Sequence, residues 1–304
     1  MADLSVKIAG VTFKNPIIAA SGTIGFGHEY SEFYPLSVFG GISCKGTTLY
    51  ERPGNPPPRI AETPMGMLNA VGLQNPGVQH FIEKDLPWLK QQDTVAIANV
   101  AGSTQEDYCR MAEILSDTDI DMIELNISCP NVKEGGVQFG TSCESVGAIT
   151  KAVRQHCKKP LIIKLSPNVA DIASIAKAAE AEGADAVSLI NTLTGMRIDI
   201  RTRRPIITNN TGGLSGPAVF PVAVRMVWQV KNAVNIPVIG MGGITTWQDA
   251  VEMMMAGADA IQIGTALFTD PYAPVKIAEG LNRYLDDNHI GSVTELTHTI
   301  QPNG

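Results

Sequence analysis

The strongest constraint on the fold is a regular alternation of short apolar runs with amphipathic helical segments. Helical spacing of apolar residues marks segments 106–115, 145–156, 172–182, 217–231 and 249–256. Runs typical of buried strands lie between and around them, at 16–21, 41–45, 95–100, 122–128, 161–166, 186–192, 238–242 and 260–265. Strands that alternate with helices predict an α/β fold with a parallel sheet, and eight such units predict one closed (β/α)8 TIM barrel.

Two helix ends repeat almost word for word and indicate a single barrel. The sequence reads EGADAV at 182–187 and AGADAI at 256–261. A glycine just past a helix, followed directly by a strand, is the turn that such barrels use repeatedly. We therefore expect one domain over residues 1–304, with a frayed tail after about residue 285, where the pattern is weak.

Three long connections follow predicted strands 2, 4 and 6. Residues 47–93 follow the second strand, residues 193–236 follow the sixth, and a polar, glycine-containing stretch follows the fourth. All three leave the carboxyl ends of strands, the face on which barrels carry their functional loops. We expect the functional site at this rim.

Composition excludes several classes of protein. The chain has 23 Lys and Arg against 30 Asp and Glu, a formal charge of −7, and no run of basic residues, so we expect no nucleic acid or anionic membrane as partner. Five scattered cysteines with no C-x-x-C pair predict neither disulfides nor a metal or iron–sulfur site. Asp3, Lys7 and Lys14 interrupt the apolar residues near the N-terminus, and no long apolar run occurs elsewhere. We therefore expect a cytoplasmic chain without a signal peptide or membrane span.

Every predicted strand ends in a polar residue or glycine. In a barrel these ends converge on one rim and would surround one pocket. The alternative is that polar residues end strands simply because turns begin there, but lysine has no turn-forming role and its ammonium is costly to bury unpaired. The strand-end residues are Ser21, Lys45, Asn99, Asn126, Lys164, Asn191, Thr192, Gly242, Gly243, Gly264 and Thr265.

The two-residue period of a strand predicts which side chains point into the barrel. In the fourth strand, Ile123 and Leu125 should face the helices, while Glu124 and Asn126 should face inward. Lys164 of the fifth strand should face inward too, where Glu124 could compensate its charge. The alternative for Lys164 is a core ion pair without chemistry.

Glycine clusters at the last two strand ends fit an anion site. GMGGI at 240–244 and IGTA at 263–266 could turn backbone N–H groups toward a phosphate, and GGLSG at 212–216 could add donors. An acidic chain could hold a phosphate in this way. Each cluster alone is equally compatible with a tight turn.

Cys129 is the candidate reactive residue. It follows the fourth strand within NISCPN at 126–131, ahead of a glycine-containing stretch, whereas the other four cysteines are better read as small apolar side chains. No histidine falls at a strand end, and a thiol can act as a proton acceptor where nearby cations favour thiolate.

These residues, taken together, resemble the dihydroorotate dehydrogenase family, whose flavin enzymes oxidise dihydroorotate to orotate in pyrimidine synthesis. The likeness spans roughly residues 4–285. It rests on an ordered series of motifs: NPIIAASGTIGFG from Asn15, the Lys45 strand, GNPPPR from Gly54, GMLNAVGLQNPG from Gly66, NISCPN from Asn126, KLSPN from Lys164, INT from Ile190, TGGLSG from Thr211, GMGGI from Gly240 and IGTA from Ile263.

The resemblance implies one FMN in the barrel mouth and dihydroorotate against the flavin face. The implied FMN positions are Ser21, Lys45, Gly46, Asn99, Asn126, Lys164, Ile190 and Gly216, with the phosphate at Gly242, Gly243, Gly264 and Thr265. The implied substrate positions are Lys45, Asn69, Ala70, Val71, Gly72, Leu73, Asn126, Asn191 and Thr192, with Asn131 as a further amide.

The resemblance also implies the chemistry. Cys129 takes the proton from C5 while hydride leaves C6 for flavin N5, and Lys164 stabilises the negative charge on the reduced ring. Cysteine at this position distinguishes the chain from the membrane-associated class, which carries serine there. Gly46 is a departure, since relatives commonly have Ser or Ala, and one flavin contact could differ.

The route by which electrons leave is implied rather than encoded. The chain has no G-x-G-x-x-G between a strand and a helix and no clustered cysteines. Around Asn69 and Asn99 it resembles the type B form, whose members join an electron-transfer subunit carrying FAD and a [2Fe–2S] cluster and reduce NAD⁺. We therefore expect a heterotetramer of two catalytic and two electron-transfer chains.

Three alternatives remain open at this stage. The type A form has the same fold, is a homodimer and uses fumarate. Dihydrouridine synthase is a flavin barrel that acts on tRNA, which the acidic composition disfavours. A non-catalytic barrel that binds a phosphate ligand is the third alternative.

Overall fold

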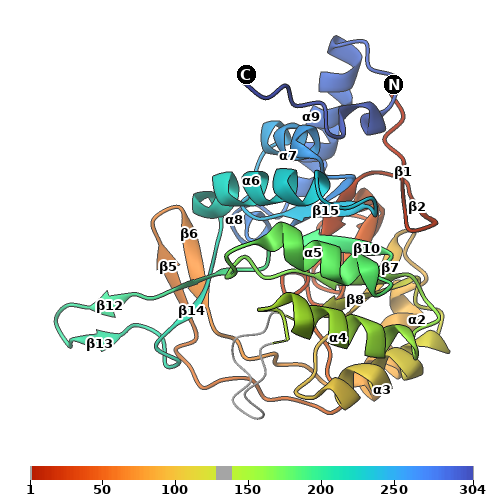
Figure 1. Ribbon diagram of the computed structural model, residues 1–304. Coiled ribbons are helices and arrows are strands. Elements are labelled where there is room, and N and C mark those ends of the chain that lie inside the picture. Colours follow the sequence, from red (N-terminus) through yellow and green to blue (C-terminus); the bar gives the residue numbers. More distant parts are fainter. Residues whose placement is uncertain (1, 128–138, 304) are drawn as a thin grey trace.

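A closed barrel of eight parallel strands forms the centre of the molecule (Figure 1). The computed structural model describes residues 2–127 and 139–303. Neighbours in the chain are neighbours in the barrel, and the last strand pairs with the first, which confirms the predicted TIM barrel. The strands are β3 (Ile17–Ala19), β4 (Gly41–Ser43), β7 (Val95–Val100), β8 (Met122–Asn126), β9 (Leu161–Lys164), β10 (Ala186–Leu189), β15 (Val238–Met241) and β16 (Ala260–Ile263).

Helices surround the barrel and bury its outer face, as Figure 1 shows. All five predicted helices are present, with ends within three residues of those predicted. The largest difference is at residue 217, because Pro217–Val219 forms the short 3₁₀ turn η4 and the α-helix begins at Phe220. The long helices are α3 (Gln105–Ser116), α4 (Cys143–Arg154), α5 (Ile172–Ala181), α6 (Phe220–Lys231), α7 (Trp247–Ala256) and α9 (Ala273–Asp287).

Side-chain caps fix where four of these helices begin: α5 is capped by Asp171, and the other three begin with a capping box. Thr104, Ser142 and Thr246 each accept a hydrogen bond from the backbone N–H three residues later, and the side chain of that later residue accepts one from the backbone N–H of the capping residue. The shorter helical pieces are η1 (Tyr30–Glu32), η2 (Leu36–Val38), α1 (Val78–His80), η3 (Phe81–Asp85), α2 (Leu86–Leu89) and α8 (Ala266–Thr269).

The repeated turns close the amino-terminal end of the barrel. Gly183 and Gly257 adopt φ of +97° and +131°, a region that favours glycine, so each helix can end and turn directly into a strand. The aspartate that follows each turn accepts a hydrogen bond from the first N–H of the preceding strand, Asp185 from Leu161 and Asp259 from Val238, both at 2.8 Å. These aspartates tie consecutive strands together on the face opposite the predicted site.

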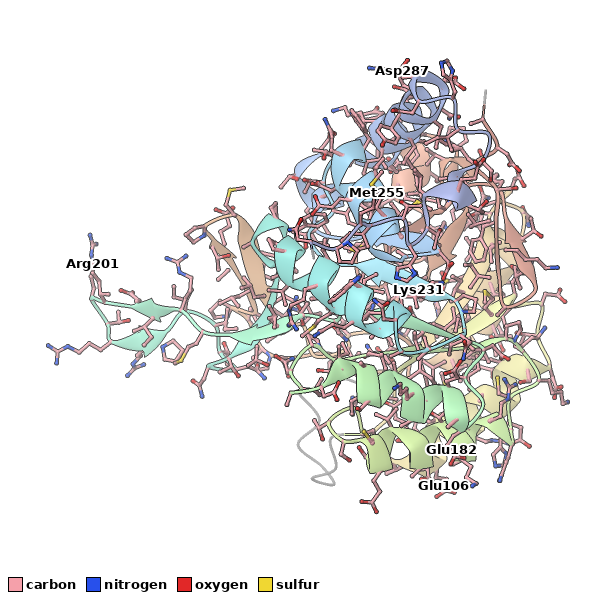
Figure 2. All side chains as sticks on the ribbon, turned by 45° about the horizontal axis from the view of Figure 1, so that its top comes forward. Glu106, Glu182, Arg201, Lys231, Met255 and Asp287 are labelled. Atoms are coloured by element: carbon pink, nitrogen blue, oxygen red, sulfur yellow. The ribbon has the colours of Figure 1, made fainter. Side chains whose placement is uncertain are left out.

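The long connections after the second and sixth strands combine into a second sheet. Its order is β11 (Leu193–Gly195), β14 (Gly212–Ser215), β6 (Gly66–Asn69) and β5 (Ile60–Thr63), all antiparallel. A two-stranded arm, β12 (Ile198–Asp199) with β13 (Arg204–Pro205), projects from this sheet, and Figure 2 shows Arg201 at its tip. The sheet belongs to the carboxyl-terminal rim, as the sequence predicted for these connections.

The carboxyl-terminal tail is packed, so the prediction of a frayed tail was wrong. After α9, the 3₁₀ turn η5 (Val293–Leu296) buries Val293 and Leu296 in the main core. Residue 3, which precedes the hairpin of β1 (Val6–Ile8) and β2 (Val11–Phe13), hydrogen-bonds this tail, since Asp3 N–H donates to Gly291 and Val293 N–H donates to Asp3. Two apolar residues three apart suffice for one buried turn but are too short a pattern to detect in the sequence.

Within the described ranges, no helix is both long and apolar enough to cross a membrane. The same part of the chain contains no cluster of three His, Cys, Asp or Glu side chains suited to a metal ion.

Candidate active site

A cavity of about 530 Å³ opens at the carboxyl ends of the barrel strands, beside the second sheet. Strand ends, both long connections and the glycine turns all contribute to its wall, so residues far apart in the sequence meet there. The residues predicted from the sequence that line it are Ser21, Lys45, Gly46, Asn69, Val71, Gly72, Leu73, Asn99, Asn126, Lys164, Ile190, Asn191, Thr192, Gly216, Gly242, Gly243, Gly264 and Thr265.

Among the described residues, one predicted position, Ala70, does not line the cavity. Ala70 is buried behind it, where its carbonyl accepts a hydrogen bond from Asn55 Nδ2 at 2.8 Å. Cys129, the predicted proton acceptor, lies outside the described residues together with Asn131. Asn126, the last residue of β8, is part of the cavity wall and precedes Cys129 by three residues in the sequence.

Beneath the cavity, the barrel interior holds a fully buried carboxylate. Glu124 points inward, as the strand alternation predicted, and accepts four hydrogen bonds. Its Oε2 accepts from Ser43 Oγ at 2.6 Å and Asn99 Nδ2 at 2.7 Å. Its Oε1 accepts from Ser188 Oγ at 2.7 Å and Gln262 Nε2 at 2.8 Å. One side chain from each of four other strands is thereby tied to β8.

Lys164 compensates the charge of this carboxylate. Burial alone raises the pKa of Glu124, but the ammonium of Lys164 and the hydrogen bonds from Ser43, Ser188 and Gln262 outweigh it, so the pKa lies below its ordinary value. Glu124 is therefore ionised near neutral pH. Lys164 itself is only 5% exposed and lines the cavity above, which bears out the charge compensation predicted for the pair.

Lys45 has a different environment. It is half-buried, two residues after β4 ends, and its pKa is lowered, first by burial and then by the positive charge of Arg59. A cation held in this way gains from an anion that enters the cavity, because the anion offsets both effects. The two lysines therefore differ: Lys164 is balanced by a buried carboxylate, whereas Lys45 is opposed by a second cation.

Amide side chains line the same cavity as these lysines. Asn191 Nδ2 donates to Asn126 Oδ1 at 3.2 Å, and Thr192 N–H donates to Asn191 Oδ1 at 2.8 Å. Tyr108 of α3 donates from its hydroxyl to the carbonyl of Asn126 at 2.8 Å, which fixes the end of β8. Side-chain amides offer both donors and acceptors and suit a planar ligand with mixed edges.

Another part of the cavity wall is formed by glycines in tight turns. Gly242 and Gly243 follow β15 with φ of +123° and +79°. A Cβ on Gly243 would lie 2.8 Å from the carbonyl oxygen of Gly216, so only glycine allows the loop after β14 to approach the loop after β15 so closely. Thr265, after β16, donates to Ser215 Oγ at 2.8 Å and links the third loop to this part of the wall.

Sequence reasoning missed several residues of this site. Gln262 of β16 lines the cavity, and the strand alternation of AIQI is sufficient to predict that its side chain points inward. Ser43 and Ser188 do not line the cavity and only support Glu124 beneath it; their inward direction could be predicted from the strand alternation, but nothing in the sequence tied them to Glu124. Met67 and Ile60 enter from the second sheet, whose strands carry no clear periodicity.

Comparison with known proteins agrees with this geometry. Residues 3–285 match the family model described as dihydroorotate dehydrogenase. The chain belongs to the dihydroorotate dehydrogenase family. The match to this family extends from the first strand into α9 and includes the whole barrel, the second sheet and every described residue of the cavity.

Individual relatives in the dihydroorotate dehydrogenase family match over almost their whole length. Each is named "Dihydroorotate dehydrogenase B (NAD(+)), catalytic subunit". The relative from Bacteroides thetaiotaomicron is 58% identical over 99% of this chain and 100% of its own length. Those from Alkaliphilus oremlandii and Lachnoclostridium phytofermentans are each 56% identical, over 97% and 98% of this chain and 97% and 99% of their own lengths.

Proposed function

We propose that this chain is the catalytic subunit of an NAD⁺-dependent dihydroorotate dehydrogenase, which oxidises (S)-dihydroorotate to orotate in de novo pyrimidine biosynthesis. The observation that carries the proposal is the identity of 56–58%, over 97–99% of this chain, with relatives that bear this name. The cavity supports it, because two lysines and a wall of amides suit a small, planar, anionic acid.

The residues of the cavity fit FMN, and we assign one FMN to the single domain formed by residues 1–304. Asn99 Oδ1 and Gln262 Oε1 are buried acceptors without a partner among the described residues, and an N–H of a bound ring would satisfy them. The glycine-lined part of the wall, at Gly242 and Gly243 together with Gly264 and Thr265, provides a narrow backbone-lined space for the phosphate. Ser21, Gly46, Ile190 and Gly216 complete the proposed FMN positions.

Dihydroorotate is assigned to the side of the cavity that is lined by the connection after the second barrel strand. The ammonium of Lys45, which is opposed by Arg59, is the proposed partner of the substrate carboxylate. Asn69, Asn126 and Asn191 are the proposed partners of the ring edges, with Thr192 and the segment Val71, Gly72 and Leu73 beside them. Ala70, being buried behind the wall, supports this segment through its backbone.

The bound flavin supplies the hydride acceptor of the reaction. We propose that Cys129 removes the proton from substrate C5. Cys129 follows Asn126 by three residues in the sequence, and Asn126 is the last residue of β8 and part of the cavity wall. Lys164, a donor at the cavity floor, is assigned to stabilise negative charge on the ring.

A partner chain completes the proposed enzyme. The relatives are named as catalytic subunits, and we propose a partner that carries FAD and a [2Fe–2S] cluster and passes electrons to NAD⁺, in an assembly of two catalytic and two electron-transfer chains. The sequence of this chain contains no dinucleotide-binding glycine motif of its own and no clustered cysteines, which is consistent with such a division of labour.

Anaerobic titration of the purified, FMN-loaded chain with dihydroorotate tests this function. We expect loss of the visible flavin absorption, complete near one equivalent, with orotate formed in the same amount. A chain that binds no flavin, or whose bound flavin keeps its colour with excess dihydroorotate, would instead indicate a non-catalytic barrel that binds a phosphate ligand.

A further inference from the structure

The cavity floor contains two amides that are both held by one buried carboxylate. Asn99 and Gln262 are each 1% exposed, line the cavity, and donate their NH₂ groups to different oxygens of Glu124. An ionised carboxylate only accepts hydrogen bonds, so each amide must turn its NH₂ toward Glu124 and its oxygen away. Both oxygens, Asn99 Oδ1 and Gln262 Oε1, then lack a partner among the described residues.

Two buried amide oxygens without a hydrogen-bond partner cost folding free energy, and rotation of the amide group by half a turn would ordinarily avoid that cost. Asn99 or Gln262 could satisfy its oxygen by turning over if a hydroxyl or N–H stood in the place of the carboxylate. Glu124 forbids this, because its pKa is held below the ordinary value by Lys164 and three hydrogen bonds and it stays ionised. The carboxylate therefore keeps both amide oxygens as buried, unpaired acceptors in residues that line the cavity.

We propose that Glu124 is a positioning residue for the flavin, acting through Asn99 and Gln262 so that both present acceptor oxygens to the N–H groups of the ring. The inference rests on the proposed function, since it takes the ligand to be FMN. Glu124 itself does not line the cavity, so its effect must pass through the amides.

The variant Glu124→Gln removes the constraint while preserving shape. A glutamine places an NH₂ group where one carboxylate oxygen was, facing the NH₂ of Asn99 or of Gln262. One of these amides must then turn over and present a donor to the cavity in place of an acceptor. We expect the affinity of the apo-protein for FMN to fall about tenfold or more, since one hydrogen bond becomes a donor–donor contact.

An exchange of the two groups should restore binding. In the double variant with Glu124→Gln and Asn99→Asp, the new amide donates to the new carboxylate, Ser43 can turn its hydroxyl to accept, and the second Asp oxygen remains an acceptor. The formal charge equals that of the wild type. We expect FMN affinity within about threefold of wild type, whereas Asn99→Asp alone, with two carboxylates in contact, should bind at least about tenfold more weakly.

Fluorescence quenching of FMN by the apo-proteins gives the affinities, and thermal unfolding of the same samples tests for a structural effect. Ser43→Ala is the matched control, because it removes one hydrogen bond to Glu124 but leaves both amides bound to it. We expect it to change FMN affinity by less than about threefold. If Glu124→Gln fails to fold, the comparison of Asn99→Asp with the double variant remains decisive.

The outcomes separate this inference from the function on which it rests. A double variant that binds FMN as weakly as the weaker single variant, or fails to fold, overturns the positioning role. Affinities that simply follow the unfolding temperatures of the variants overturn it too. A wild-type apo-protein that binds no FMN contradicts the proposed function itself.

Discussion

At the scale of single residues, the two lysines of the cavity differ in what balances their charge. Lys164 lies above an ionised Glu124, whereas Lys45 is half-buried near Arg59 and has a lowered pKa. A lysine whose pKa is lower in the folded than in the unfolded state destabilises the fold while it is charged. Lys45 is therefore retained at the expense of stability, as is common for residues that bind ligands.

Lys45→Met should consequently stabilise the apo-protein in a pH-dependent way. At pH 7, both states of the wild type carry the proton and the full penalty applies, so the variant should unfold about 2 °C higher. As pH rises through the lowered pKa toward the ordinary value of 10.5, the wild type loses its penalty and the difference should shrink. Thermal unfolding between pH 7 and the ordinary pKa of 10.5 measures this, and Lys7→Met, at an exposed position of β1, is the control. A variant that unfolds earlier, or a difference that grows with pH, would contradict the assigned environment.

Cys129→Ser tests the assigned proton acceptor. Because a hydroxyl is a far weaker base than a thiolate near neutral pH, flavin reduction by dihydroorotate should slow roughly a hundredfold or more while FMN stays bound. Stopped-flow absorbance under anaerobic conditions measures the rate. Cys143→Ser, at an exposed thiol at the start of α4, should leave it unchanged. Equal rates for wild type and Cys129→Ser across the pH range would remove Cys129 from the mechanism.

At the scale of elements, the sequence was most informative where a pattern repeats. All eight barrel strands and five of the outer helices were predicted from the sequence pattern. The alternation in β8 also predicted correctly that Glu124 points into the barrel. The second sheet did not follow, because β6 and β14 are short, contain glycine, and lie more than a hundred residues apart in the chain. Non-local pairing of this kind has no local sequence signal.

The packing of the carboxyl-terminal tail could not be predicted from the sequence either, for a different reason. The turn η5 buries only Val293 and Leu296, and its anchor is residue 3 at the far end of the chain. Such a contact depends on where the two termini meet in space rather than on any local pattern. In the site, likewise, strand ends predicted which residues converge, but not that Ser43, Ser188 and Gln262 share one carboxylate.

Leu296→Ala tests whether the tail belongs to the core. The side chain is 2% exposed, so the variant should lose about 2–4 kcal/mol of unfolding free energy through lost burial and a residual cavity. Chemical denaturation measures the change, and Gln301→Ala, at an exposed position, serves as the control. A change of less than about 0.5 kcal/mol, as is usual at the surface, would show that the tail contributes nothing to the fold.

At the scale of the whole molecule, the barrel brings distant parts of the chain to one mouth, yet the proposed reaction needs a second protein. The match to the dihydroorotate dehydrogenase family covers the catalytic barrel. The proposed transfer of electrons to NAD⁺ requires groups that this sequence does not encode. The assembly, rather than the chain, is therefore the proposed functional unit.

Turnover with different oxidants tests this dependence. The isolated chain should reduce its flavin with dihydroorotate but show little steady-state turnover with either fumarate or NAD⁺, and addition of the electron-transfer partner should bring NAD⁺ turnover up at least about a hundredfold. Orotate formation measured by absorbance follows both reactions. Rapid fumarate turnover by the chain alone would favour the homodimeric, fumarate-dependent form instead.

The most direct test of the account is a crystal structure of the chain with FMN and orotate bound. We predict the phosphate between Gly242, Gly243, Gly264 and Thr265, the ring above Asn99 and Lys164, and the orotate carboxylate within hydrogen-bond distance of Lys45 Nζ. An FMN phosphate at another end of the cavity, or orotate bound away from Lys45 and Asn69, would contradict the assignment of this mouth as the active site.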